Sequence, residues 1–331
     1  MFRIVRPHIF PLLALALALA AGPAASQRVA EPPKHGAPPP FFNGVTPEQG
    51  AYYAAGGTSI EHHRDAAQEL AEARLLQGQL AALAPQRKGV VDAYVVSVAL
   101  DSDGVFAREA REAGRVLTAR YAAQGRSITL AGPDGRGGPL LARGSPANLD
   151  MALARVAELI DPKEDVLILY TTSHGAPFGV VYNYGDEGWG VMSPARLDAL
   201  LDALRIKRRL LIVSACFSGI FVPALATGDT AILTASSGDR TSFGCQADSD
   251  WTFFGDALIN QALRKPQPLE AAGREAAGLI GQWEAKGSLT PSLPQMLIGE
   301  RAKAWLTALD TRAPKVASSP VGRPAVSLLE K

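Results

Sequence analysis

The chain has 331 residues, 47% hydrophobic and 20% charged, a composition typical of a soluble globular protein with one large or two small domains, and one that excludes disorder and collagen. Its 33 basic and 32 acidic residues give a net charge of +1, which provides no positive field for a nucleic-acid backbone. Two cysteines, Cys216 and Cys245, allow at most one disulfide, which excludes a scaffold held together by disulfides.

The first 26 residues are predicted to form a secretory signal peptide. Arg3 and Arg6 precede an apolar run over residues 9–21, and small residues up to Ser26 follow. The run is shorter than the roughly 20 residues of a membrane-spanning helix, and Pro11 interrupts it. We therefore expect cleavage after Ser26 and no stable membrane span afterwards. The mature protein loses two arginines and no acidic residue, so its net charge is −1, and we expect it in the periplasm or outside the cell.

The segment after the signal peptide, residues 27–60, is rich in proline and glycine, a composition that opposes helix and sheet. We interpret it as a linker or a pro-segment. Residues 61–88 are predicted to hold an amphipathic helix over about 61–84, because their leucines recur near helical spacing. Our hypothesis is that both segments form a removable or shielding pro-region, with Asn43-Gly44 as a candidate self-cleavage site.

From residue 89 onward, apolar runs rich in β-branched residues alternate with helical segments. Strands are predicted at residues 90–100, 127–130, 165–172, 209–214 and 230–235. Helices are predicted at residues 104–122, 146–160, 193–204 and 251–263, and a hairpin over 178–192. This alternation predicts an α/β domain over residues 89–264, with a mainly parallel sheet flanked by helices. Residues 265–331 are expected to form a C-terminal helical segment and a flexible tail.

Two reactive side chains follow neighbouring strands of this predicted sheet. His174 follows the strand at 165–172, and Cys216 follows the strand at 209–214. Right-handed crossovers deliver both residues to the same edge of the sheet, where functional loops of such sheets lie. A thiolate is a nucleophile, and a nearby imidazolium lowers the pKa of the thiol and can protonate an amine leaving group. His174 is the only histidine after residue 63, so a Cys–His mechanism has one candidate base.

The main-chain N–H groups of Gly175 and Cys216 are candidates for stabilising a tetrahedral oxyanion. Each residue also has a structural interpretation. A His-Gly pair at the end of a strand is commonly a turn, and a buried cysteine is commonly a small hydrophobic residue. The joint placement of His174 and Cys216 favours catalysis over either structural role.

The order of these motifs resembles that of caspase-like cysteine peptidases, and more closely that of the legumain (asparaginyl endopeptidase) family, which includes the catalytic subunit of the GPI transamidase. An apolar strand ends in His-Gly, and a second apolar strand ends in Ala-Cys. The further matching motifs are Thr234-Ala235-Ser236, Arg240-Thr241-Ser242-Phe243-Gly244-Cys245, Thr252-Phe253-Phe254-Gly255-Asp256, and Arg108 in the first helix of the domain. The resemblance covers about residues 89–264.

This resemblance implies a cysteine endopeptidase that hydrolyses peptides or proteins through a Cys216–His174 dyad and an acyl-enzyme, with no cofactor and no metal. It also implies a pocket that holds asparagine before the cleaved bond. The residues that match this pocket by motif position are Arg108, Ser214, Thr241, Ser242 and Asp256. A carboxamide offers one acceptor and two donors, which arginine and aspartate satisfy from opposite sides. Physics alone favours a surface ion pair or solvated charges for Arg108 and Asp256.

Two residues depart from the family's pattern. Ser214 stands where the family has glutamate, and Glu109 stands where the family usually has histidine, so the preference for asparagine is a weaker inference than the peptidase chemistry. Cys245 is expected to be a free structural thiol. Two alternatives remain open: a transpeptidase that passes the same thioester to an amine, and a catalytically silent binding module. No dinucleotide loop, Walker A motif or serine elbow is present, and His62 and His63 diverge on their predicted helix, which argues against a shared metal.

Overall fold

The computed structural model describes residues 1–2, 29–37, 45–62 and 64–330. The body of the predicted signal peptide and the Asn43-Gly44 pair lie outside these described residues. Within the described ranges, no helix combines the length and the apolar character that crossing a membrane requires.

The main sheet has six strands in the order β10-β9-β8-β4-β2-β3. In chain order, the strands are β2 (Ala93–Ala99), β3 (Ser127–Leu130), β4 (Val166–Thr172), β8 (Arg209–Ser214), β9 (Thr230–Thr234) and β10 (Gln295–Ile298). All neighbours are parallel except β10, which runs antiparallel to β9. The strands β2, β4, β8 and β9 are buried along their whole length, as expected for parallel strands covered on both faces.

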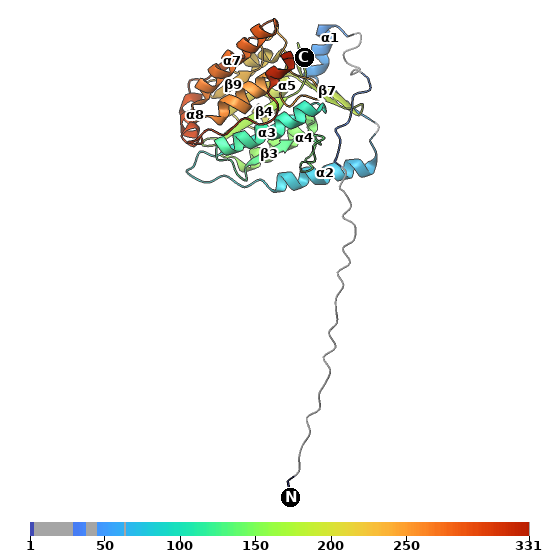
Figure 1. Ribbon diagram of the computed structural model, residues 1–331, viewed down its shortest axis with the longest axis vertical. Coiled ribbons are helices and arrows are strands. Elements are labelled where there is room, and N and C mark those ends of the chain that lie inside the picture. Colours follow the sequence, from blue (N-terminus) through green and yellow to red (C-terminus); the bar gives the residue numbers. More distant parts are fainter. Residues whose placement is uncertain (3–28, 38–44, 63, 331) are drawn as a thin grey trace.

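Helices cover both faces of this sheet (Figure 1). One face packs against α3 (Gly104–Arg120), a π-helix (Gly255–Gln261), α7 (Leu269–Lys286) and α8 (Ala302–Asp310). The other packs against α2 (Ala66–Ala81), α4 (Pro146–Leu159), α5 (Pro194–Ala203) and α6 (Phe221–Leu225). Consecutive residues of β2 serve opposite cores: Val95 lies in the first and Val96 in the second. The predicted α/β class, with a mainly parallel sheet flanked by helices, is confirmed.

A second, antiparallel sheet lies beside the main one, with the strand order β1-β7-β6-β5. Its strands are β1 (Ser59–Glu61), β5 (Gly175–Ala176), β6 (Gly179–Tyr184) and β7 (Gly188–Met192). The strands β6 and β7 form the hairpin predicted over residues 178–192. Because β5 begins directly after His174, this sheet anchors the loop that carries the candidate base.

The proline-rich segment contains a helix that its composition did not predict. Helix α1 spans Pro47–Ala55, with Pro47 at its first position and Thr46 as its N-cap. The side chain of Thr46 accepts a hydrogen bond from the Gln49 N–H, and the Gln49 side chain accepts one in return from the Thr46 N–H. Proline opposes helix only in the interior, whereas the first turn tolerates it and a capping box favours it.

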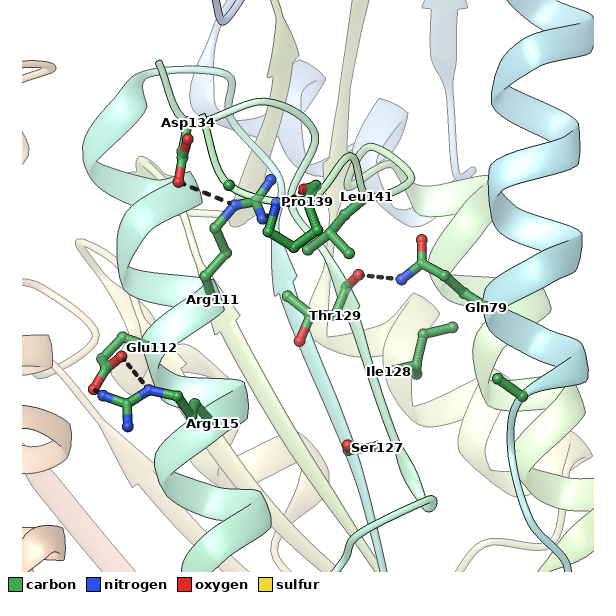
Figure 2. A pocket seen from close by; sticks show the side chains of 12 residues that line it. Gln79, Arg111, Glu112, Arg115, Ser127, Ile128, Thr129, Asp134, Pro139 and Leu141 are labelled. Carbon is green, nitrogen blue, oxygen red and sulfur yellow. Dashed lines mark hydrogen bonds and ion pairs between the residues drawn. The ribbon is translucent and has the colours of Figure 1, made fainter. Parts of the chain in front are cut away.

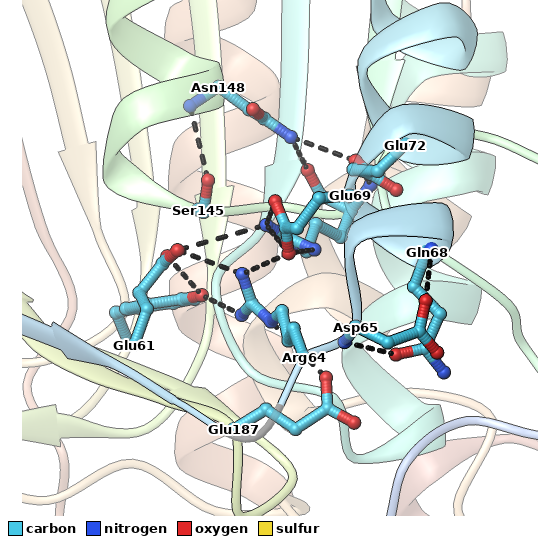
Figure 3. Close-up of polar contacts among 11 residues, drawn as sticks. Glu61, Arg64, Asp65, Gln68, Glu69, Glu72, Ser145, Asn148 and Glu187 are labelled. Carbon is cyan, nitrogen blue, oxygen red and sulfur yellow. Dashed lines mark hydrogen bonds and ion pairs between the residues drawn. The ribbon is translucent and has the colours of Figure 1, made fainter.

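The helix predicted from residue 61 begins later, at Ala66. Residues 59–61 instead pair as β1 with β7, and Asp65 caps the helix by accepting a hydrogen bond from the Gln68 N–H at 2.8 Å. Ion pairs join the region from β1 to α2 to the rest of the fold (Figure 3). Arg64, whose side chain is 5% exposed, donates to Glu61 at 2.8 Å and to Glu187 at 3.2 Å. The region from β1 to α2 is thus packed into the fold.

Parts of the C-terminal segment pack against the domain, whereas residues 315–324 are exposed. Strand β10 extends the main sheet, and Trp251 donates its indole N–H to the Val321 carbonyl at 2.8 Å. The Ala325 N–H donates to the buried carboxylate of Asp256 at 2.7 Å. A buried carboxylate requires donors, and the tail supplies one of them.

Candidate active site

The two reactive side chains lie at equivalent points beyond neighbouring strands. Thr172 at the end of β4 pairs with Ser214 at the end of β8, and His174 and Cys216 each lie two residues further on. The main chains remain in contact there, because a Cβ built on Gly175 would lie 1.9 Å from the Cys216 carbonyl oxygen and 2.9 Å from its nitrogen. Only glycine fits at position 175. The structure therefore brings His174, Gly175 and Cys216 together, as the predicted topology requires.

The imidazole of His174 is held by a carboxylate and an aromatic ring. Its Nε2 lies 3.6 Å from Oδ2 of Asp103, and the edge of the Phe106 ring packs against it at a centroid distance of 5.0 Å. Burial opposes the charge on the imidazole, but the hydrogen bond to Asp103 and the carboxylates of Asp101 and Asp103 outweigh it and raise the pKa of His174 above its usual value. Its hydrogen bond with His174 in turn lowers the pKa of Asp103.

The thiol of Cys216 has an environment that favours the thiolate. A hydrogen bond from the Cys245 thiol lowers the pKa of Cys216 most, whereas burial raises this pKa. The Ser242 N–H, 3.2 Å from Sγ, and the charge of His174 lower it further. The net result is a pKa of about 6 for Cys216. The same hydrogen bond, with burial, raises the pKa of Cys245 well above its usual value. Both cysteines are free thiols. Cys245 is thus a donor to the candidate nucleophile, a contact that its expected structural role did not include.

The turn after Cys216 has a strained backbone. Phe217 has φ = 58°, in the left-handed region that residues with a bulky side chain rarely adopt, and its N–H donates to the Arg240 carbonyl at 2.8 Å. Strain of this kind costs on the order of 1–3 kcal/mol and persists where the surroundings impose it. The turn separates β8 from the short helical segment that begins at Ser218 and places Cys216 at the strand end.

Arg108 and Asp256, which match residues of an asparagine pocket, contact different parts of the chain. Arg108 donates to the main-chain carbonyls of Ala247 at 2.6 Å, Ser249 at 3.1 Å and Asp134 at 3.3 Å. Asp256 is fully buried and accepts hydrogen bonds from Asn260 at 2.8 Å and from the tail. The arginine therefore holds the loop at residues 247–249, and the aspartate holds the C-terminal segment.

The other residues matched to the pocket also lie in different surroundings. Ser242 contacts Cys216 through its main chain, and Thr241 beside it is exposed. Ser214 is buried and donates its hydroxyl to the carboxylate of Glu109 at 2.8 Å. That carboxylate also accepts hydrogen bonds from Tyr170 at 2.6 Å, Thr172 at 2.7 Å and the Thr252 N–H at 2.9 Å. The two departures from the family's pattern, at positions 109 and 214, are therefore in direct contact.

Two cavities lie near this region. One, of about 600 Å³, lies between residues 31–35, the loop after β2, and the loops at 134–136 and 247–248, and Arg108 lines it. The other, of about 470 Å³, lies between α2, α3 and β3 (Figure 2). Its lining includes Gln79, whose amide donates to the Thr129 carbonyl at 2.7 Å, and none of the predicted site residues. The first cavity adjoins the candidate site through Asp103.

A cysteine and a histidine thus lie at adjoining strand ends of a parallel sheet. Residues 148–277 match the Peptidase C13 family, and the matched part of the chain holds His174, Cys216 and Asp256 but not Arg108. The match confirms the resemblance found in the motifs. It implies a cysteine-type hydrolase whose substrates are peptides or proteins.

The other comparisons give more distant likenesses. No curated protein matches the chain. Caspase-1 from Spodoptera frugiperda is 14% identical, with 65% of this chain and 88% of that chain covered and a TM-score of 0.43. Pro-sf-caspase-1 is 11% identical, with 64% of this chain and 92% of that chain covered and a TM-score of 0.44.

Sequence reasoning did not identify Asp103 as part of the site. It follows β2, which lies next to β4 in the sheet, so the edge that carries His174 also carries Asp103. The signal was present in the sequence: Asp101-Ser102-Asp103-Gly104 follows an apolar strand and opens a helix. A carboxylate at such a position is a candidate to orient an imidazole.

Proposed function

We propose that this protein is a cysteine endopeptidase in which Cys216 is the nucleophile and His174 the acid/base. The observation that carries the proposal is the pairing of Thr172 with Ser214, which sets a histidine and a low-pKa thiol side by side at one sheet edge. Between about pH 6 and the raised pKa of His174, the resting dyad is a thiolate and an imidazolium. This is the charge state that cysteine peptidases use for acylation.

The reaction proceeds in two steps. The Cys216 thiolate attacks the peptide carbonyl, and the N–H groups of Gly175 and Cys216 stabilise the oxyanion. The His174 imidazolium then gives its proton to the leaving amine, the C–N bond breaks, and a thioester remains on Cys216. In the second step, neutral His174 takes a proton from water, the hydroxide displaces the thioester sulfur, and the carboxylic product leaves. Asp103 holds the imidazole through Nε2, which leaves Nδ1 for these proton transfers.

A peptidyl electrophile with asparagine at its reactive end tests the nucleophile. We expect one covalent adduct, by intact mass, on the wild type and on Cys245→Ala, and none on Cys216→Ala. Labelling of Cys216→Ala equal to that of the wild type would contradict the assignment. If no peptide electrophile labels the wild type, the silent binding module is the better description.

The same reagents address specificity, for which the support is the family resemblance. A matched set of electrophiles that differ only in the last side chain, with asparagine, aspartate, glutamine, arginine and leucine, ranks the preference by labelling rate. We expect asparagine to react fastest. Equal rates across the set would remove asparagine from the proposal and leave the peptidase chemistry intact. An added amine nucleophile separates a hydrolase from a transpeptidase by the mass of the product.

A further inference from the structure

Residues 29–37, which we call the N-terminal strap, cross the sheet edge that carries the candidate site. The Pro33 carbonyl accepts a hydrogen bond from the Ser102 hydroxyl at 2.8 Å, in the loop after β2. The Gly36 N–H donates to the Asp186 carboxylate at 2.9 Å, in the turn between β6 and β7. The strap also forms one wall of the 600 Å³ cavity beside Asp103. It is therefore joined to the loop after β2, which carries Asp103, and to the turn between β6 and β7.

One side chain of the strap reaches further in than the others. The imidazole of His35 is hydrogen-bonded through Nδ1 to the Gly185 carbonyl at 3.2 Å and through Nε2 to Oδ1 of Asp101 at 2.9 Å. The same Nε2 lies 3.6 Å from Oδ1 of Asp103, whose other oxygen, Oδ2, lies 3.6 Å from Nε2 of His174. Asp103 thus offers one carboxylate oxygen to each of two imidazoles.

The carboxylates of Asp101 and Asp103 favour the charged form of His35. The side chain of Asp101 is fully buried, and its Oδ1 accepts hydrogen bonds from His35 and from the Asp103 N–H at 2.8 Å. Burial opposes charge on His35, but the hydrogen bond to Asp101 and the charges of Asp101 and Asp103 outweigh it and raise the pKa of His35 to about 9. At neutral pH the imidazolium of His35 therefore balances a buried carboxylate.

The consequence for the candidate base follows from the shared carboxylates. The charged groups that face His35 are Asp101 and Asp103, and those that face His174 are Asp101, Asp103 and Cys216. Without His35, Asp103 would keep His174 as the cation that faces it. The imidazole of His174 would then be held more firmly in its charged form, and the Asp103 side chain would lose one of the two contacts that orient it.

We propose that His35 is a positioning residue of this active site, which acts on His174 through Asp101 and Asp103, so that the N-terminal strap is a retained part of the enzyme. This inference rests on the proposed function. It assigns the strap a role opposite to that of a removable pro-region, which our sequence-based hypothesis assigned to the segment as a whole. The two roles differ in what happens when the contact is broken: a pro-region inhibits, whereas a positioning residue supports catalysis.

The direct test follows the titration of His174 by NMR in the purified chain with labelled histidines, assigned with His174→Gln. In His35→Gln we expect the pKa of His174 to rise by about one pH unit, because a neighbouring cation that shares its carboxylates is lost. We also expect the alkaline limb of the kcat/KM profile to move to higher pH by about one unit, and kcat/KM at neutral pH to fall about tenfold because Asp103 loses one of the two contacts that orient it. Lys34→Gln is the matched control, because it removes an exposed positive charge from the same strap, and the His174 titration should not move.

A second variant separates positioning from a merely structural role. In an Asp103→Asn background, His35→Gln should shift the His174 titration much less than it does in the wild type, because the shared carboxylate is gone. Equal shifts in both backgrounds, or an unchanged titration in His35→Gln, would overturn the proposal. An active enzyme whose N-terminus, by sequencing, begins after residue 37 would overturn it as well. If the wild type has no peptidase activity, the proposed function fails, and the NMR titration still decides the coupling between His35 and His174.

Discussion

Replacement of Cys245 by alanine should raise the pKa of the nucleophile. In the structure the largest contribution to the low pKa of Cys216, about 6, is a hydrogen bond from the Cys245 thiol. A hydrogen bond to a charged group contributes about 1.5–3 kcal/mol, and one pKa unit corresponds to about 1.36 kcal/mol. Loss of the donor should therefore raise the pKa of Cys216 by about 1–2 units, to about 7–8.

The assay is the rate of alkylation of Cys216 by iodoacetamide as a function of pH, with the modified site identified by peptide mass. At pH 6 about half of the wild-type thiol is ionised, whereas in Cys245→Ala about 1–10% should be, so the rate should fall roughly five- to fiftyfold. Cys245→Ser keeps a donor and should stay close to the wild type. A Cys245→Ala profile that coincides with that of the wild type would refute the assigned role of Cys245.

Three further outcomes test other parts of the site. Gly175→Ala should reduce kcat at least a hundredfold and lower Tm, because its Cβ would lie 1.9 Å from a carbonyl oxygen of the nucleophile's main chain; a wild-type kcat would exclude the close approach. Asp103→Asn should lower the pKa of His174, so the alkaline limb of the kcat/KM profile should move to lower pH; an unmoved limb would show that the carboxylate does not act on the base. Ser214→Glu alone should lower the free energy of unfolding by about 3–5 kcal/mol, and Glu109→His should recover part of it, as chemical denaturation would show; strictly additive effects would count against their coupling.

Local patterns predicted much of the fold. The strands at 127–130 and 209–214 have the bounds that hydrophobic spacing indicated. Strand β10 was not predicted, because its four residues are half-exposed and its strand character comes from pairing with β9. The late start of α2 has a similar cause, since β7 pairs with the residues that would have formed its first turn. Tertiary pairing decides such short segments, and a local pattern does not record it.

The candidate site, too, could be predicted from the sequence only in part. His174 and Cys216 could be placed together because parallel topology sends neighbouring strand ends to one edge. The contacts of Arg108 and Asp256 could not be anticipated, because their partners are main-chain groups of the loop at 247–249 and of the tail at Ala325. A motif identifies a residue type at a position, whereas the group to which that residue donates depends on loops that are distant in sequence.

The buried carboxyl group of Glu109 connects the two departures from the family's pattern. The family has a carboxylate before Ala-Cys and a histidine after the first-helix arginine, whereas this chain has Ser214 and Glu109. The structure places those two side chains 2.8 Å apart, so the carboxylate is kept and has moved to the facing helix. The buried carboxylate of Glu109 has four hydrogen-bond donors, which compensate for the loss of water. A second carboxylate at position 214 would repel it. Each departure, taken alone, removes a residue of the family's pattern, whereas together they keep one buried carboxyl group in contact with Ser214, two residues before Cys216.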